Sequence, residues 1–296
     1  MPVTLIKSTD AGAPALTGLA GGLITVLDYA LVTRLGWTKA QTGTNKAAYK
    51  ASAPEASGAL FWVDDTTTKY ATVRGYETMS GLDTGTNPFP TTMQTMLFAQ
   101  KSNIADSAAR PWMIVGDERL FYLVTEWHLG YPSNGDIVVF GDIVSFKSGD
   151  AWPALIIAGV SSTPSYPSQQ TNNAFARLDG VCVGHYLARN YAQVVGSIAA
   201  LKYGHRTTVG MGNSTAMAYP APVDNGLYLT PVEVWESVTI RGLLPGCYAP
   251  LNHNPGNHSD TITDIVGLPG KSVELINISY TTTPFRVGID VTGPWR

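Results

Sequence analysis

The sequence is short of charge. Charged residues make up 14% of its 296 residues, and 19 basic against 22 acidic residues leave a formal charge of -3. An average soluble protein has about 25% charged residues. This balance offers no general attraction for a phosphate backbone, so we expect no nucleic-acid partner. Hydrophobic residues reach 44%, which is enough to bury a core and excludes a disordered chain.

Cysteine is scarce as well. Cys182 and Cys247 are the only two, and they are far apart in the sequence. That number and spacing exclude a zinc ribbon and a disulfide framework. We interpret both as buried free thiols, because each lies among apolar neighbours. A single bridge between them would require Cα atoms within about 7 Å of each other.

The chain also lacks an uninterrupted apolar run long enough to cross a membrane. Residues 16–27 are mostly apolar, but Asp28 ends the stretch short of the roughly 20 residues that a span needs. Only Lys7 precedes this stretch as a basic residue, and no small-residue cleavage motif follows it. We therefore expect neither a signal peptide nor a membrane span.

Motifs of known enzyme classes are missing too. The sequence contains no Gly-x-Ser-x-Gly elbow, phosphate-binding loop, His-Glu-x-x-His helix or dinucleotide fingerprint. Acidic residues do occur in pairs, at Asp64 with Asp65, Asp117 with Glu118, and Glu233 with Glu236. We interpret these pairs as turn formers or solvated faces, and we predict a non-enzymatic protein without a cofactor.

The densest polar cluster spans residues 252–260. His253, His258 and Asp260 lie within it and are weak candidates for metal ligands. Their spacing matches no known ligand framework, and Pro255-Gly256 between the two histidines is typical of an exposed turn. We therefore predict no metal site.

What the sequence does contain favours β-structure. It has 30 Gly and 19 Pro, which suits many turns between strands. Residues 18–35 carry apolar side chains at helical spacing, with Thr17 as a candidate N-cap. From Trp37 onward the apolar period changes to two, and three hairpins are predicted. Their strands cover residues 37–42 with 46–50, 60–63 with 70–76, and 112–115 with 120–127. We predict a mainly β fold of sandwich-like or barrel-like modules with one N-terminal helix.

Three polar segments interrupt this pattern. Residues 79–90 are rich in Gly, Thr, Asn and Pro and are predicted to form a long loop, followed by a short helix within 91–98. Residues 161–174 contain almost nothing that could enter a core, which suggests a linker. We therefore predict an N-terminal domain over residues 1–165 and a C-terminal β domain over residues 166–296.

Long polar loops often serve partners, so residues 79–90, 161–174 and 252–260 are the predicted contact surfaces. Phe89 lies between two prolines and would lose little entropy on docking. Four tyrosines next to Gly, Pro or Asn are further candidate anchors: Tyr131, Tyr166, Tyr191 and Tyr219. Trp295 and Arg296 follow Gly293-Pro294, and we expect them to be tucked against a surface rather than frayed.

Short phrases spread along the chain resemble a family of tailed-bacteriophage virion proteins of loosely assigned role. They are STDAGAP at 8–14, LTG at 16–18, GTNKA at 43–47, VRGYE at 73–77, DTGT at 83–86, PFP at 88–90, ARPW at 109–112, FGD at 140–142, RG at 241–242, LPG at 244–246 and DVTGPWR at 290–296. The resemblance implies a structural virion component, with no catalytic residues to carry over.

From this resemblance we predict a subunit of the tail or baseplate. It would be assembled in the bacterial host cytoplasm and contact copies of itself and other virion proteins. Rigid β modules with little net charge suit a symmetric assembly of many copies. Two alternatives remain open at this point. One is a head protein that decorates the capsid, and the other is a tail protein that binds or hydrolyses host glycans, the latter with a pair such as Glu233 and Glu236.

Overall fold

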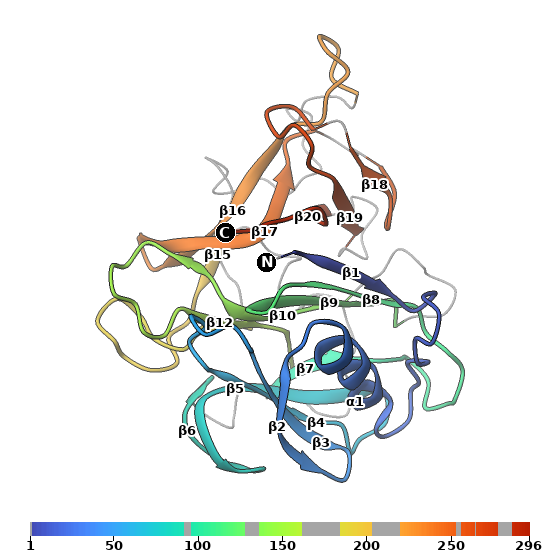
Figure 1. Cartoon of the computed structure of the whole chain (residues 1–296), viewed down its shortest axis with the longest axis vertical. Helices are drawn as coiled ribbons and strands as arrows, with labels where there is room; N and C mark the ends of the chain where they lie inside the picture. The colour runs from blue at the N-terminus through green and yellow to red at the C-terminus, as the bar shows by residue number, and fades with distance from the viewer. Residues whose placement is uncertain are drawn as a thin grey trace.

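The fold is seen in a computed structural model, which describes residues 2–91, 96–127, 136–161, 184–202, 220–252, 256–263, 265–277 and 286–296 (Figure 1). Within these ranges the chain forms three antiparallel sheets stacked in layers, with one helical segment. The mainly β prediction is confirmed. No helix in the described part of the chain is long and apolar enough to cross a membrane.

The helical segment begins with α1 (Gly22–Leu27) and continues as a π-helical stretch, Asp28–Arg34. Its buried face carries the apolar residues whose spacing predicted a helix over 18–35. The start differs from the prediction, because Thr17 does not cap it. The first free amides, those of Leu23 and Ile24, instead donate to the carboxylate of Asp65 at 2.7 and 3.2 Å. A carboxylate from a distant turn therefore satisfies groups that a local cap usually serves.

The sheet next to this helix is called the helix-side sheet. Its strands run in the order β13-β7-β5-β4-β3-β2, and β6 pairs with β5. They are β2 (Thr38–Gly43), β3 (Lys46–Lys50), β4 (Leu60–Asp64), β5 (Tyr70–Gly81), β6 (Thr84–Phe89), β7 (Met96–Gln100) and β13 (Gly159–Ser161). The pairing of β2 with β3 and of β4 with β5 confirms the first two predicted hairpins.

The predicted loop over residues 79–90 is wrong, because most of it forms a hairpin. β5 extends to Gly81, and β6 follows after a tight turn. Threonine favours strands, and the Thr78 and Thr86 hydroxyls lie 2.6 Å apart across the hairpin. The short helix expected within 91–98 is also wrong from Met96 onward, where β7 begins. Residues 92–95 lie outside the described part of the chain.

The central sheet lies between the other two and follows the order β1-β8-β9-β10-β12-β14. Its strands are β1 (Thr4–Lys7), β8 (Trp112–Gly116), β9 (Leu120–Thr125), β10 (Asp136–Asp142), β12 (Ala154–Ile157) and β14 (His185–Leu187). The β8–β9 pairing confirms the third predicted hairpin. Both faces of this sheet pack against a core, which explains the continuous apolar runs within β8, β9, β10 and β12.

The C-terminal sheet follows the order β15-β16-β17-β20-β19-β18, and β11 pairs with β17. Its strands are β15 (Ala200–Lys202), β16 (Leu229–Glu236), β17 (Thr239–Pro250), β18 (Thr261–Ile262), β19 (Val273–Asn277), β20 (Arg286–Asp290) and β11 (Val144–Ser145). The pairing of β11 with β17 and of β12 with β14 crosses the predicted domain boundary near 165. That boundary stays a prediction.

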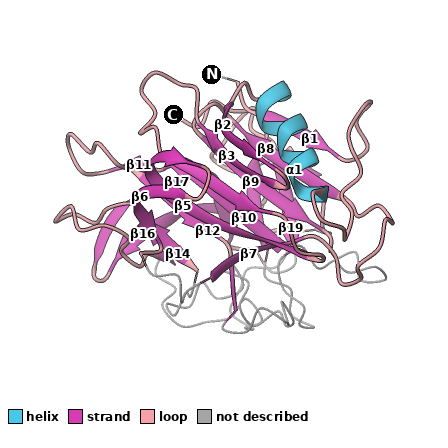
Figure 2. Cartoon of the chain, turned by 90° about the horizontal axis from the view of Figure 1, so that it is seen from below, coloured by secondary structure: helices cyan, strands magenta, loops and turns pink. Residues whose placement is uncertain are grey.

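Two hydrophobic cores lie between the three stacked sheets. The core between the helix-side and central sheets also takes in α1, which lies beside β1 and β8 in the view from below (Figure 2). The core between the central and C-terminal sheets contains Cys247, which is buried and free, as predicted. Burial raises the pKa of the Cys247 thiol, which makes it unreactive. Cys182 lies outside the described residues.

Candidate functional site

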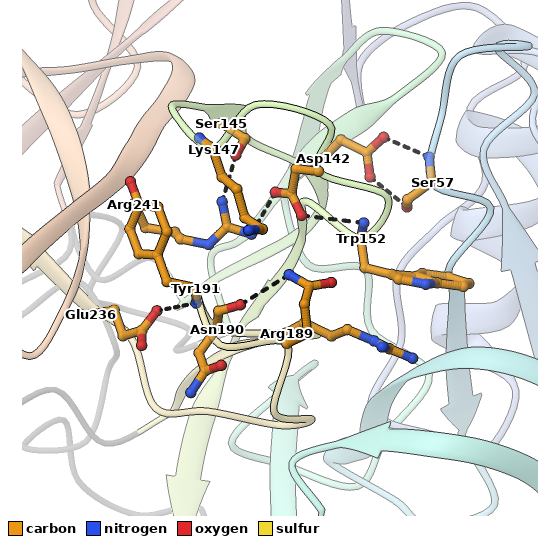
Figure 3. Close-up of polar contacts among 12 residues, drawn as sticks. Ser57, Asp142, Ser145, Lys147, Trp152, Arg189, Asn190, Tyr191, Glu236 and Arg241 are labelled. Carbon is orange, nitrogen blue, oxygen red and sulfur yellow. Dashed lines mark hydrogen bonds and ion pairs between the residues drawn. The ribbon is translucent and has the colours of Figure 1, made fainter.

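A polar cluster joins all three sheets, and Figure 3 shows a close-up of it. We call it the polar junction and define it by its charged and aromatic members: Glu77, Asp142, Asp150, Arg189, Tyr191, Glu236 and Arg241. They come from β5 of the helix-side sheet, β10 of the central sheet, β16 and β17 of the C-terminal sheet, and two connecting loops.

Arg241 is the buried cation of the polar junction. Its side chain has no exposed surface, and its guanidinium donates to the carboxylate of Asp150 and to the hydroxyl of Ser145. The guanidinium also lies 5.1 Å from the centre of the Tyr191 ring, a distance at which a cation and an aromatic face attract. These contacts hold the loop between β11 and β12 against β17.

Arg189 makes the corresponding link to the helix-side sheet. Its Nε and Nη2 donate to the two carboxylate oxygens of Glu77 at 2.5 and 2.8 Å. A two-pronged pairing of this kind fixes the orientation of both groups. The hydrogen bond to Glu77 is the main reason why the pKa of Arg189 is raised.

Asp142 links the central sheet to the helix-side sheet. Its two oxygens accept the amide and the hydroxyl of Ser57 at 2.8 and 2.6 Å. Arg119 reaches the same carboxylate at 3.4 Å. The acids of the polar junction are thus engaged in bonds that tie one sheet to another.

Tyr191 belongs to this joint, although the sequence suggested an exposed anchor. Its hydroxyl donates to the Ile240 carbonyl oxygen at 2.7 Å, and its amide donates to Glu236 at 2.8 Å. The residue is half-buried. The β16–β17 hairpin therefore holds both ends of Tyr191, and contact of its half-exposed ring with another molecule stays a prediction.

Three exposed apolar side chains lie on segments that also contribute residues to the polar junction. Phe146 is 54% exposed, Val194 58% and Val238 84%. Phe146 donates its amide to the Arg241 carbonyl oxygen, Val194 lies in the loop that carries Tyr191, and Val238 lies in the turn between β16 and β17. We call Phe146, Val194 and Val238 the apolar rim.

Phe89, the predicted docking anchor, is fully buried, so the expected exposure is wrong. Its ring stacks on Phe140 with centroids 6.1 Å apart and planes 13° apart. Gly75, its strand partner, provides the room, because a Cβ at Gly75 would lie 2.1 Å from the Phe89 ring. An aromatic residue beside a glycine on the neighbouring strand fits the core without a clash.

The C-terminal residues are tucked against the chain, as expected. The Trp295 indole nitrogen donates to the Asp290 carbonyl oxygen at 2.9 Å, and its ring meets Tyr122 edge-on at 5.5 Å. Arg296 donates to the carboxylate of Asp117 at 2.6 Å. Contacts of these two residues with other molecules stay a prediction. The other predicted anchors, Tyr131, Tyr166 and Tyr219, lie outside the described residues.

The paired acids serve different purposes. Asp117 accepts the amides of Arg119 and Leu120, both at 2.8 Å, which confirms its expected role in a turn. Asp65 is not a solvated turn residue, because it is fully buried and paired with Lys101. Glu233 accepts the Trp235 indole at 2.8 Å, while Glu236 belongs to the polar junction. No local pattern indicated that Asp65 would meet Lys101.

Of the weak metal candidates, His258 lines a small cavity. His258 faces Glu126 at 3.3 Å, and Asp260 accepts the amide of Asn257 within its own loop. The cavity has a volume of about 200 Å³, and its lining includes Lys7, Trp112, Glu126 and His258. Among the described residues no three His, Cys, Asp or Glu side chains gather as a metal site would require. His253 is not among those residues.

Sequence reasoning missed the members of the polar junction other than Tyr191 and Glu236. One signal for Arg241 was present, because an arginine inside an apolar strand is rarely buried without a partner. The identity of that partner, Asp150, could not be read from the sequence. Comparison of the sequence with protein-family models and with curated proteins found no match.

Proposed function

We propose that this chain is a non-enzymatic structural subunit of a tailed-bacteriophage virion, located in the tail or baseplate, where it contacts copies of itself and other virion proteins. The observation that carries the proposal is the polar junction, in which ion pairs tie three stacked sheets together while apolar groups remain exposed around it. The resemblance of short phrases to virion proteins supports the same role.

The engagement of the acids supports a role without catalysis. A catalytic carboxylate has to reach its substrate, yet Asp65, Asp142 and Asp150 are buried and bonded within the chain. Stacked sheets joined in this way form a rigid body, and a rigid body loses little entropy when many copies pack together. The small formal charge of -3 adds little repulsion between copies.

The apolar rim is the surface that we assign to contact with a second copy. Apolar groups as exposed as Val238, at 84%, gain free energy when a neighbouring subunit covers them. The amide of Phe146 donates to the Arg241 carbonyl oxygen, and the amide of Val194 donates to the Asn190 side chain, so these backbone positions are held before assembly.

Sedimentation velocity of the purified full chain over a range of concentrations tests this assignment. We expect the average mass to rise with concentration, and we expect a Phe146→Ser and Val238→Ser double variant to stay monomeric. Val223→Ser is the matched control, because Val223 is 95% exposed but lies outside the apolar rim. Equal association of the double variant and the wild type would contradict the role of the rim.

A glycan-binding tail protein is the second candidate, and the cavity beside His258 favours it. At about 200 Å³ it is large enough for one sugar ring, and its lining offers carboxylate, imidazole and ammonium groups. Saturable binding of the chain to host polysaccharide, lost in Glu126→Gln, would support this candidate. Cleavage of the polysaccharide would contradict the non-enzymatic role. Capsid decoration remains the alternative location.

A further inference from the structure

Asp65 and Lys101 form an ion pair that is closed off from water. Both side chains have no exposed surface. Asp65 follows β4 directly, and Lys101 follows β7 directly, so the pair joins two parts of the helix-side sheet that are 36 residues apart in sequence. A buried lysine paired with a buried acid is costly as an ion pair, because both charges lose their hydration.

Each oxygen of the Asp65 carboxyl group has a different neighbour. Oδ1 is in direct contact with Nζ of Lys101. Oδ2 accepts the amides of Leu23 and Ile24 at 2.7 and 3.2 Å. Two backbone donors aimed at one oxygen are the arrangement that stabilises negative charge on that oxygen when a nucleophile adds to the carbon.

The side-chain amine of Lys101 is also held in a defined orientation. Nζ of Lys101 donates to the carbonyl oxygens of Leu19 and Thr67 at 2.7 and 3.0 Å, and its third direction faces Asp65. If the proton between the two side chains moves to Asp65, the two remaining N–H groups keep their carbonyl partners. The nitrogen lone pair then points toward the carboxyl group.

Burial favours this proton transfer. It raises the pKa of Asp65 and lowers the pKa of Lys101, and in both cases loss of hydration is the largest cause. A desolvated neutral lysine is a nucleophile, whereas an ammonium group is not.

We propose that Lys101 and Asp65 become joined by an intramolecular isopeptide bond once the chain has folded. Nζ attacks Cγ of the protonated Asp65 carboxyl group, and the Leu23 and Ile24 amides hold the negative charge on Oδ2. Nζ then passes a proton to Oδ1, which leaves as water while the C=O bond forms again. An amine and a carboxylic acid give an amide and one water molecule, with no other reactant. Fixed proximity and the exclusion of water promote the bond.

A second lysine–aspartate pair provides a comparison within the same chain. Lys271 meets Asp290 at 2.9 Å and also donates to the Gly293 carbonyl oxygen at 2.8 Å. Its side chain is 25% exposed, so water can solvate the ammonium group. We therefore expect Lys271 to stay unlinked, which makes it the internal control.

Intact-mass spectrometry of the denatured full chain tests the proposal. The expected mass is that of the sequence minus one water molecule. Trypsin should no longer cut after Lys101, and one branched peptide should join residues 51–69 to the segment containing Lys101. Cleavage after Lys271 should be normal. Lys101→Arg keeps the positive charge but is not a comparable nucleophile, and its mass should match its sequence.

A chain without the isopeptide bond would give a different mass and peptide map. If the folded wild-type chain, after days at physiological temperature, still has the full sequence mass and is cut after Lys101, the proposal is wrong. The peptide map of the wild type decides this even if Lys101→Arg fails to fold. The outcome is independent of the proposed virion role, because no step involves another molecule.

Discussion

The two faces of the central sheet are closed in different ways. Toward the helix-side sheet the core is built around rings, and Phe140 is within 6.4 Å of four other rings, those of Trp37, Phe61, Phe89 and Phe121. Toward the C-terminal sheet the core is mostly aliphatic, with Val139, Ile157, Val234 and Ile289 among its members. Neighbouring residues of one strand thus enter two cores of different character.

This difference predicts how each face responds to change. Rings that meet edge-on or stacked fix one another's position, so removing one leaves a cavity that its rigid neighbours cannot fill. Small branched side chains leave smaller cavities and can shift to close them. A single substitution in the core toward the helix-side sheet should therefore lower the free energy of unfolding more than one in the core toward the C-terminal sheet.

The largest effect is expected at Phe140. Phe140→Ala should lower the free energy of unfolding by about 3–5 kcal/mol. Val139→Ala, the next residue along β10 but on the other face, should cost about 2 kcal/mol. Urea unfolding followed by fluorescence measures both. Equal losses would remove the contrast between the two faces.

A buried acid between the central and helix-side sheets should make the free energy of unfolding depend on pH. Asp136 accepts the amide of Gln100 at 2.9 Å, and burial raises its pKa to about 6. The folded chain therefore holds this proton more tightly than the unfolded chain, in which the pKa is about 3.9. The associated stability is fully present below about pH 4 and is lost as the pH rises through 6, a change of about 3 kcal/mol.

Asp136→Asn isolates this contribution, since the amide does not titrate. Between pH 4 and 7 the wild type should lose stability relative to the variant, as measured by urea unfolding at each pH. If the difference between the two proteins stays constant over this range, Asp136 is not the titrating group.

A smaller loss of stability is expected at Gly246, where Trp295 packs beside the mostly aliphatic core. Gly246 has a φ of +68°, and a Cβ there would lie 2.2 Å from the Trp295 indole nitrogen. Gly246→Ala should cost about 2 kcal/mol through strain and displacement of the ring.

Gly12→Ala is the control for Gly246→Ala, because Gly12 has a similar φ of +80° with no atom within 4 Å of the new Cβ. It should cost only about 1 kcal/mol. Thermal unfolding compares the two variants, and an equal shift in Tm would show that Trp295 does not rest on Gly246.

The smallest effect on stability is expected at the apolar rim. The Phe146→Ser and Val238→Ser variant should change the free energy of unfolding by less than about 0.5 kcal/mol, although it should abolish association. Calorimetry of the monomer measures this. A large loss would assign these residues to the fold of the chain rather than to contact between copies.

Much of the fold could be predicted from local patterns. The apolar spacing of residues 18–35, and the period-two runs that became β2 to β5, β8 and β9, identified the helix and three hairpins. Composition misled at residues 79–90, because polar Thr and Asn form a strand once a neighbouring strand supplies their hydrogen bonds. The strand propensity of a residue takes no account of a neighbouring strand such as β5.

The candidate site was less predictable, because its contacts join residues far apart in the sequence. Arg241 meets Asp150, and Arg189 meets Glu77 across 112 positions. The flanking prolines of Phe89 favour a position at the surface. The ring is buried instead, because Gly75 on the next strand leaves space for it. Such pairings depend on strand register, which the sequence of one strand does not determine.

Electron microscopy of phage particles labelled with an antibody against this chain tests whether the chain is a structural part of the virion. We expect label at fixed, symmetric positions on the tail or baseplate. Label on the head would keep the virion role and correct the location to the capsid. Particles without label, while the chain is present in the lysate of infected cells, would contradict a structural role in the virion.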